Sequence, residues 1–167
     1  MNTRLLAAVG IAALALTACS TTTPSAAPGS GAPAAPAATS AKPAKPADAT
    51  AWAELAKQGS TTKIVTITED NDPNNLIGRP NGYKTAAVIY DSGASCDQLG
   101  TSCGGTVEVF ATEAEAKARS EYTQGVLKDA PMFGTEYHTL NGAALLRITG
   151  NIKPSVATGY ADAFSAA

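Results

Sequence analysis

The feature that most constrains this chain is the tract of residues 20–49, which contains six prolines and almost no large apolar side chain. Such a segment cannot bury enough apolar surface to offset the entropy cost of ordering it. Its prolines also favour extended polyproline II conformations. We therefore predict a flexible tether here, and folding confined to residues 50–167, which is the length of one ordinary domain.

An apolar run, LLAAVGIAALALTA, follows the opening MNTR. It is shorter than the roughly 20 residues that a membrane-spanning helix needs. One positive charge before the run and small residues at its end are typical of a secretory signal peptide. We predict a signal peptide over residues 1–18. The alternative, a buried core helix, is disfavoured because the run lacks helix caps and precedes the proline-rich tract.

The tetrapeptide Leu16-Thr17-Ala18-Cys19 resembles the lipobox of bacterial lipoproteins in both residue types and position. The resemblance implies that Cys19 is the N-terminus of the mature chain and carries a diacylglycerol thioether. Two or more acyl chains anchor a protein stably to a membrane. We therefore expect an extracytoplasmic protein, held at the outer face of the cell membrane by Cys19, with residues 19–49 as its tether.

The chain has three cysteines, and lipidation of Cys19 leaves Cys96 and Cys103. Exported compartments are oxidising, so we predict a disulfide between these two. The alternative is a metal site, which needs more soft ligands than two cysteines and one distant histidine supply. We expect neither a metal nor a cofactor.

Residues 50–167 contain nine Lys and Arg against thirteen Asp and Glu, with no basic run or stripe. A net charge of about −4 argues against a nucleic-acid partner. It also argues against direct attraction to an anionic lipid surface. The expected partners are the membrane, through the lipid anchor, and an envelope protein or other ligand that the sequence does not identify.

Hydrophobic periodicity predicts an order of helix, three strands, helix, two strands and helix. The segment 85–91, TAAVIYD, is apolar on both faces and is therefore expected at the centre of the sheet. Consecutive strands with additional helices predict an α+β fold. We expect a two-layer sandwich with a mainly antiparallel sheet and its helices on one face. The expected helices are 50–58, 112–130 and 153–164, and the expected strands are 63–70, 85–91, 105–111 and the hairpin 135–149.

The middle helix has the clearest local signals. Thr112 and Glu115 have the spacing of a capping box. Glu113 with Lys117, and Glu115 with Arg119, have the spacing of ion pairs on one helix surface. An apolar stripe recurs every four residues and is expected to face the core: Ala114, Ala118, Tyr122 and Val126.

The dipeptide Asn141-Gly142 predicts a β-hairpin with a two-residue turn. That turn pairs Leu140 with Ala143 and places Glu136 opposite Arg147, an ion pair across the strands. His138 would share their face, which we expect to be the less buried one. A catalytic role for His138 is the alternative, but the sequence places no nucleophile beside it, so a solvated histidine is favoured.

The stretch VIYDSGASC, residues 88–96, resembles the active-site turn of aspartic proteases. The resemblance implies a catalytic Asp91 that shares a proton with a second aspartate. However, the helical sequence that begins at residue 112 does not suit the all-β fold of those enzymes. Asp, Ser and Gly are also the residues that a turn after a strand uses. We predict the turn, with an aspartic peptidase as the alternative.

The loop 69–83, EDNDPNNLIGRPNGY, is the best candidate for a binding loop, because long ordered loops often bind ligands. Asp70, Asp72 and Asn74 alternate like the first ligands of a calcium loop. Position six is Asn75 and position twelve is Asn81, however, and neither supplies what such a loop requires there. A loop built on Asx turns is therefore favoured over a calcium-dependent binding module.

Arg79 lies in the same loop, between Gly78 and Pro80, where its guanidinium could bind a carboxylate or phosphate. The favoured interpretation is that it pairs with the acidic residues of its own loop. The stretches DPNNLIGRPNGY and TVEVFATEAEAKARSEY resemble small uncharacterised envelope lipoproteins of actinobacteria. Because that resemblance implies no activity and no complete catalytic set is visible, we expect a non-enzymatic binding or accessory module.

Overall fold

The computed structural model describes residues 44–167. The predicted signal peptide, the predicted lipidation site Cys19 and the predicted tether up to residue 43 lie outside this part of the chain. Within the described residues, every helix is too short or too polar to span a bilayer.

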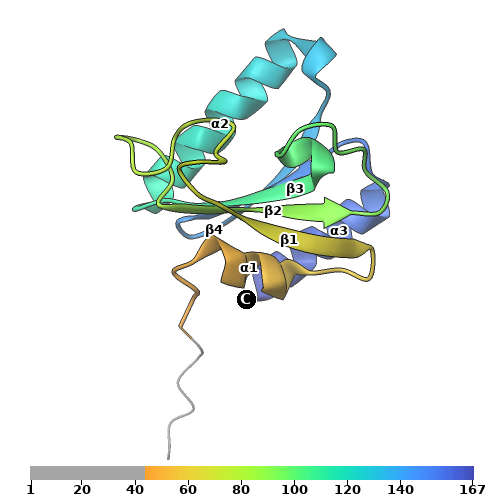
Figure 1. Ribbon diagram of the computed structural model, residues 1–167, viewed down its shortest axis with the longest axis horizontal. Coiled ribbons are helices and arrows are strands. Elements are labelled where there is room, and N and C mark those ends of the chain that lie inside the picture. The colour runs from red at the N-terminus through yellow and green to blue at the C-terminus, as the bar shows by residue number, and fades with distance from the viewer. Residues whose placement is uncertain (1–43) are drawn as a thin grey trace, which may run out of the picture. The chain divides into compact units, whose positions relative to one another are not determined.

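Five antiparallel strands form one sheet in the order β1-β2-β3-β5-β4 (Figure 1). Strand β2 has neighbours on both sides, as its apolar sequence predicted, whereas β1 and β4 are the edges. The strands are β1 (Thr61–Ile67), β2 (Thr85–Asp91), β3 (Gly104–Val109), β4 (Glu136–Asn141) and β5 (Ala144–Thr149).

Helices α1 (Ala49–Ala56) and α3 (Pro154–Ala166) cover one face of the sheet, and α2 (Glu113–Asp129) lies across the other (Figure 1). The predicted α+β sandwich with an antiparallel sheet is confirmed. Helix α2 departs from the expectation that all helices share one face. Two short 3₁₀ turns, η1 (Thr101–Cys103) and η2 (Pro131–Phe133), complete the fold.

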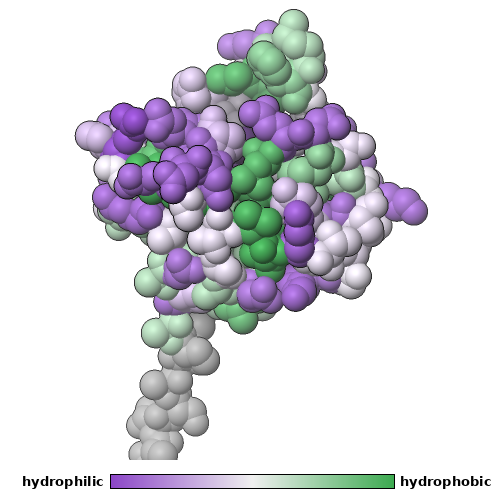
Figure 2. All heavy atoms as spheres, in the orientation of Figure 1, coloured by the Kyte–Doolittle hydropathy of each residue, from purple (hydrophilic) through white to green (hydrophobic). Residues whose placement is uncertain are grey.

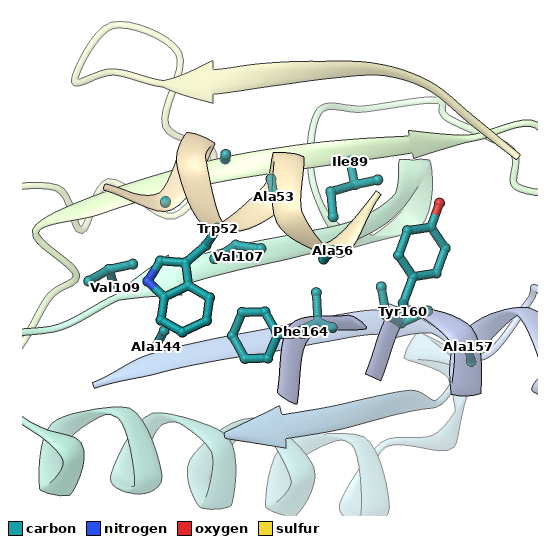
Figure 3. Close-up of a cluster of buried hydrophobic side chains, with 14 of the residues drawn as sticks. Trp52, Ala53, Ala56, Ile89, Val107, Val109, Ala144, Ala157, Tyr160 and Phe164 are labelled. Carbon is teal, nitrogen blue, oxygen red and sulfur yellow. The ribbon is translucent and has the colours of Figure 1, made fainter. Parts of the chain in front are cut away.

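The larger core lies under α1 and α3, on what we call the helix-pair face of the sheet (Figure 3). The rings of Trp52 and Phe164 pack at 4.7 Å between centroids. The indole nitrogen of Trp52 donates to the carbonyl of Pro46 at 2.7 Å. The folded domain therefore begins slightly before residue 50. On α1, Ala53 is buried whereas Leu55 is exposed.

The hairpin forms, but its register differs from the prediction by two residues. Asn141 pairs with Ala144, and the two turn residues are Gly142 and Ala143. Gly142 has φ 62°, which suits a glycine at the first turn position. His138, rather than Glu136, therefore lies directly opposite Arg147. Because the shift is two residues, each side chain keeps its predicted face.

Helix α2 is rotated relative to the prediction. Its capping box forms as expected between Thr112 and Glu115. Ala116 and Thr123, however, are its buried residues, whereas Tyr122 is 67% exposed. The predicted apolar stripe thus faces solvent. The physical reason is that the sheet surface beneath α2 is charged, so the helix turns its polar side toward that surface.

Two glycines offer a matched test of the packing. A Cβ on Gly105 in β3 would lie 2.8 Å from the Arg147 carbonyl oxygen and against Ile148, whereas one on Gly125 in α2 would meet nothing within 4 Å. We expect Gly105→Ala to lower the free energy of unfolding by about 1–3 kcal/mol through overpacking. Gly125→Ala should raise it by about 0.5–1 kcal/mol through helix propensity. Urea denaturation measures both, and equal effects would contradict this packing.

Candidate functional site

A cleft of about 330 Å³ opens on the sheet face opposite α1 and α3, which we call the cleft face. Its floor consists of side chains from the first three strands: Ile67, Ala86, Val88 and Thr106. The long loop 68–84 forms one wall, the disulfide loop 92–103 forms the other, and charged residues of β4 and β5 close one end. This volume is at the lower end of the range for small-molecule sites.

Asp72 organises the first wall. Its carboxylate accepts hydrogen bonds from the backbone N–H groups of Asn74 (2.9 Å), Leu76 (2.6 Å) and Ile77 (2.9 Å). It also accepts one from the hydroxyl of Tyr83, a side chain that is only 1% exposed. The loop is therefore fixed to the sheet at one point by its own aspartate, as the Asx-turn interpretation predicted.

These contacts change two pKa values. Partial burial alone would raise the pKa of Asp72, but the hydrogen bonds from Tyr83 and the backbone outweigh burial and lower it. Burial and the neighbouring Asp72 carboxylate raise the pKa of Tyr83 above its ordinary value. Asp72 therefore stays ionised and Tyr83 stays protonated near neutral pH. The Tyr83 hydroxyl thus remains the donor and the Asp72 carboxylate the acceptor of their hydrogen bond.

The predicted binding-loop residues separate onto two sides of the loop. Asn74 lines the cleft, whereas Asp70, Asp72 and Arg79 border an outer hollow of about 430 Å³. Arg79 donates to the side-chain oxygen of Asn75 at 2.7 Å, so the expected pairing with an acidic residue of the loop is wrong. Residues 44–167 gather no group of three His, Cys, Asp or Glu side chains that could hold a metal ion.

A disulfide closes the second wall. Cys96 and Cys103 are bonded, as predicted, and the segment between them lines the cleft through Gln98 and Leu99. The hydroxyls of Thr101 and Thr106 are hydrogen bonded at 2.5 Å, which attaches this loop to β3. Because the loop is held at both its cysteines and its centre, its backbone is pre-organised around the cleft.

A chain of ion pairs closes the end of the cleft. Arg147 donates twice to Glu136, both at 2.8 Å, and once to Glu108 at 2.8 Å. Arg119 from α2 approaches the other side of Glu108 at 3.2 Å. Glu108 is fully buried, so its charge needs both arginines. Two carboxylates and two guanidiniums leave this cluster without net charge.

Burial works to raise the pKa of Glu136, but hydrogen bonds from His138 and Arg147 outweigh it and lower the value to about 2. Burial of the Arg147 side chain would by itself lower its pKa. The hydrogen bonds from Arg147 to Glu136 and the charge of Glu108 nevertheless raise the pKa of Arg147. Glu136 and Arg147 are therefore both ionised at neutral pH.

Within residues 44–167, Ser120, His138 and Glu136 form an arrangement that resembles a catalytic set. The Ser120 hydroxyl lies 2.8 Å from His138 Nδ1, and His138 Nε2 lies 2.8 Å from Glu136. The prediction of a solvated histidine is therefore wrong, because α2 covers the ring. Ser120 and His138 are absent from the cleft lining, and Glu136 is held by Arg147. The line of hydrogen bonds attaches α2 to β4.

Asp91 lies on the helix-pair face, away from the cleft. Its carboxylate accepts hydrogen bonds from the hydroxyls of Ser60 and Tyr160 and from the N–H of Gly93. None of these partners is a carboxyl group, so the paired acids of an aspartic peptidase do not form here. The Ala94 N–H also bonds to the Asp91 carbonyl. Residues 91–94 therefore form the turn that was predicted.

The cleft combines an apolar floor with hydrogen-bond donors and acceptors at its border. Arg147 has five N–H bonds and uses three on carboxylates, so two remain available. The Gln98 side chain is exposed at the rim and offers an amide donor and acceptor. Since the ion cluster is neutral, the cleft suits an uncharged ligand with amide or hydroxyl groups.

The sequence patterns did not identify several residues of this site. Glu108 and Arg119 were not recognised as partners, because Arg119 was assigned to Glu115 on the helix surface. Glu115 instead accepts from the backbone N–H groups of Ala111 and Thr112. One signal was available: Glu108 alternates with Val107 and Val109, so it had to lie on the opposite face of β3.

The lowered pKa of Glu136 predicts acid sensitivity. Between about 4.5 and about 2 the unfolded state binds more protons at this group, so the free energy of unfolding falls as pH drops through that window. The loss attributable to Glu136 should total about 3 kcal/mol. We expect Glu136→Gln to be less stable at pH 7 and to lack this part of the pH dependence. Denaturation curves at several pH values would contradict the assignment if the variant kept the wild-type slope.

Comparisons with protein-family models, with curated protein sequences and with solved structures gave no match to this chain.

Proposed function

We propose that this protein is a non-enzymatic, lipid-anchored envelope module that binds a small uncharged ligand in the cleft. The observation that carries the proposal is the cleft itself, which two fixed loops enclose over an apolar sheet surface. Pre-organised walls reduce the entropy cost of binding. Among the hydroxyls that line the cleft, Thr101 and Thr106 bond to each other and Ser102 donates to the backbone carbonyl of Gln98, whereas the Glu136 carboxylate is held by Arg147.

The ligand chemistry follows from the lining. Ile67, Ala86 and Val88 give apolar contact, whereas Gln98 and Arg147 offer hydrogen bonds. The space equals that of about ten water molecules, which suits one or two acetamido sugar units or a short uncharged peptide. Either ligand carries the amide groups that the rim can bind and the apolar surface that the floor can cover.

The extracytoplasmic location is supported by two independent features. The Cys96–Cys103 disulfide is typical of oxidising compartments. The sequence Leu16 to Cys19 has the lipobox pattern, and the proline-rich tract after it is long enough to hold the domain away from a membrane. We infer that the acyl chains fix the protein to the outer face of the cell membrane while the cleft stays accessible.

The anchor can be tested by substitution. In the native envelope, Cys19→Ser should move the protein from the membrane fraction to the aqueous fraction, because it removes the site of acylation. The double variant Cys96→Ser and Cys103→Ser is the control and should stay with the membrane. Mass spectrometry of wild type should show a lipid-bearing N-terminal cysteine. A wild-type chain without lipid would contradict the anchor.

Ligand binding can be tested with two uncharged probes, the N-acetylglucosamine trimer and acetyl-trialanine amide. Titration calorimetry with the full chain should detect binding of one of them. Ser102→Trp should abolish it, because Ser102 lines the cleft and is exposed, so the larger ring would fill the cavity. Ser92→Trp, at an exposed position outside the lining, is the matched control. No binding of either probe to wild type would overturn this ligand class.

A further inference from the structure

The outer face of α2 is apolar and uncovered by any element of residues 44–167. Tyr122 is 67% exposed and Val126 38%, and in the turn that follows, Met132 is 82% and Phe133 69% exposed. Figure 2 shows apolar side chains gathered at the upper end of the view, over the C-terminal end of α2. An apolar patch of this kind on a small domain commonly marks an interaction surface.

Two hollows on this face have the spacing of helix packing. The first is bordered by Glu115, Ala118, Arg119 and Tyr122, with Leu76 and Asn81 beside it. The second is bordered by residues 121, 122, 125, 126, 129 and 130. Each contains the i, i+3, i+4, i+7 set that forms a hole for a side chain of a facing helix, and the two holes are seven residues apart. The surface therefore suits a helix with protruding side chains.

We propose that the occupant is α2 of a second copy of this chain, packed antiparallel about a two-fold axis. Tyr122 protrudes from the stripe, and beside it Gly125 leaves the second hollow open. In a two-fold pair, each Tyr122 fills the Gly125 hollow of the other copy. The same placement brings Met132 and Phe133 of each copy toward Ala114, at the start of α2 in the other. One surface thus supplies both knob and hole, as isologous pairing requires.

Charge complementarity supports this occupant. With Tyr122 over Gly125, Glu121 of one copy lies beside Lys128 of the other, and the two-fold axis produces that pair twice. Asp129 likewise lies toward Arg119 of the second copy, whose Nη1 makes no hydrogen bond within residues 44–167. Glu121 already forms an exposed ion pair with Lys117 at 3.7 Å, and such pairs exchange partners at little cost.

The expected dimer is weak in solution. The exposed apolar side chains supply on the order of 500 Å² per copy, whereas a standard interface buries about 800 Å² on each partner. Helix α2 has 17 residues, so the contact is limited to about 25 Å of helix. Copies confined to one surface would meet at a higher effective concentration, so association would be favoured wherever the chain is anchored.

The test uses residues 19–167 carrying Cys19→Ser, so that neither the lipid anchor nor the apolar run that precedes it affects the result. Sedimentation velocity should show a concentration-dependent monomer–dimer equilibrium. Tyr122→Ala should weaken association about tenfold or more, since a central aromatic knob carries much of such an interface. Tyr122 is largely exposed, so the fold should tolerate the change. A wild-type chain that stays monomeric at every accessible concentration would overturn the proposal, and the surface would then belong to another partner.

Cysteine cross-linking tests the antiparallel arrangement of the two α2 helices in the proposed dimer. Gly125→Cys lies at the proposed contact and has space for a side chain, whereas Leu55→Cys lies on exposed α1 as the matched control. Mild oxidation should cross-link the first variant at least tenfold faster than the second. Lys128→Glu should weaken the dimer, and adding Glu121→Lys should restore it. Equal cross-linking rates, or no rescue by the second substitution, would contradict the antiparallel arrangement.

Discussion

The buried carboxylate of Glu108 is the constraint on which the rest of this structure depends. A fully buried charge is tolerated only when it is paired and hydrogen bonded. Arg147 supplies one partner from the next strand, and Arg119 supplies the other from α2. Since one of the two partners is on the helix, the pairing of Glu108 and the position of α2 are determined together. Glu136 and His138 extend the same network to the edge strand.

This network explains two features that otherwise look unrelated. Because α2 must direct Arg119 and Ser120 at the sheet, its apolar residues are left on the outside, where Tyr122 and Val126 are exposed. The same charges end the apolar floor of the cleft and place Arg147 at its border. The polar network thus borders the cleft with Glu136 and Arg147 and leaves an apolar stripe of α2 exposed.

Local signals in the sequence predicted most of the fold. Strand alternation and the Thr112 capping box each act within one element and are visible along the chain. The rotation of α2 about its own axis could not be predicted from such local signals. Periodicity identifies an apolar stripe but cannot show that the facing sheet surface is charged. The hairpin register failed for a related reason, because Asn-Gly is compatible with more than one turn and Gly142 occupies the first turn position here.

The hydrogen bond that joins the end of the tether to the folded domain has a mechanical consequence. Pro46 accepts a hydrogen bond from Trp52, and Trp52 packs into the helix-pair face. Any tension along residues that precede Pro46 would act first on this indole and on α1, on the side of the sheet away from the cleft. Strands β1 to β3, held by their ladders, would separate that load from the cleft. A stretched tether would therefore disturb α1 before it deformed the cleft.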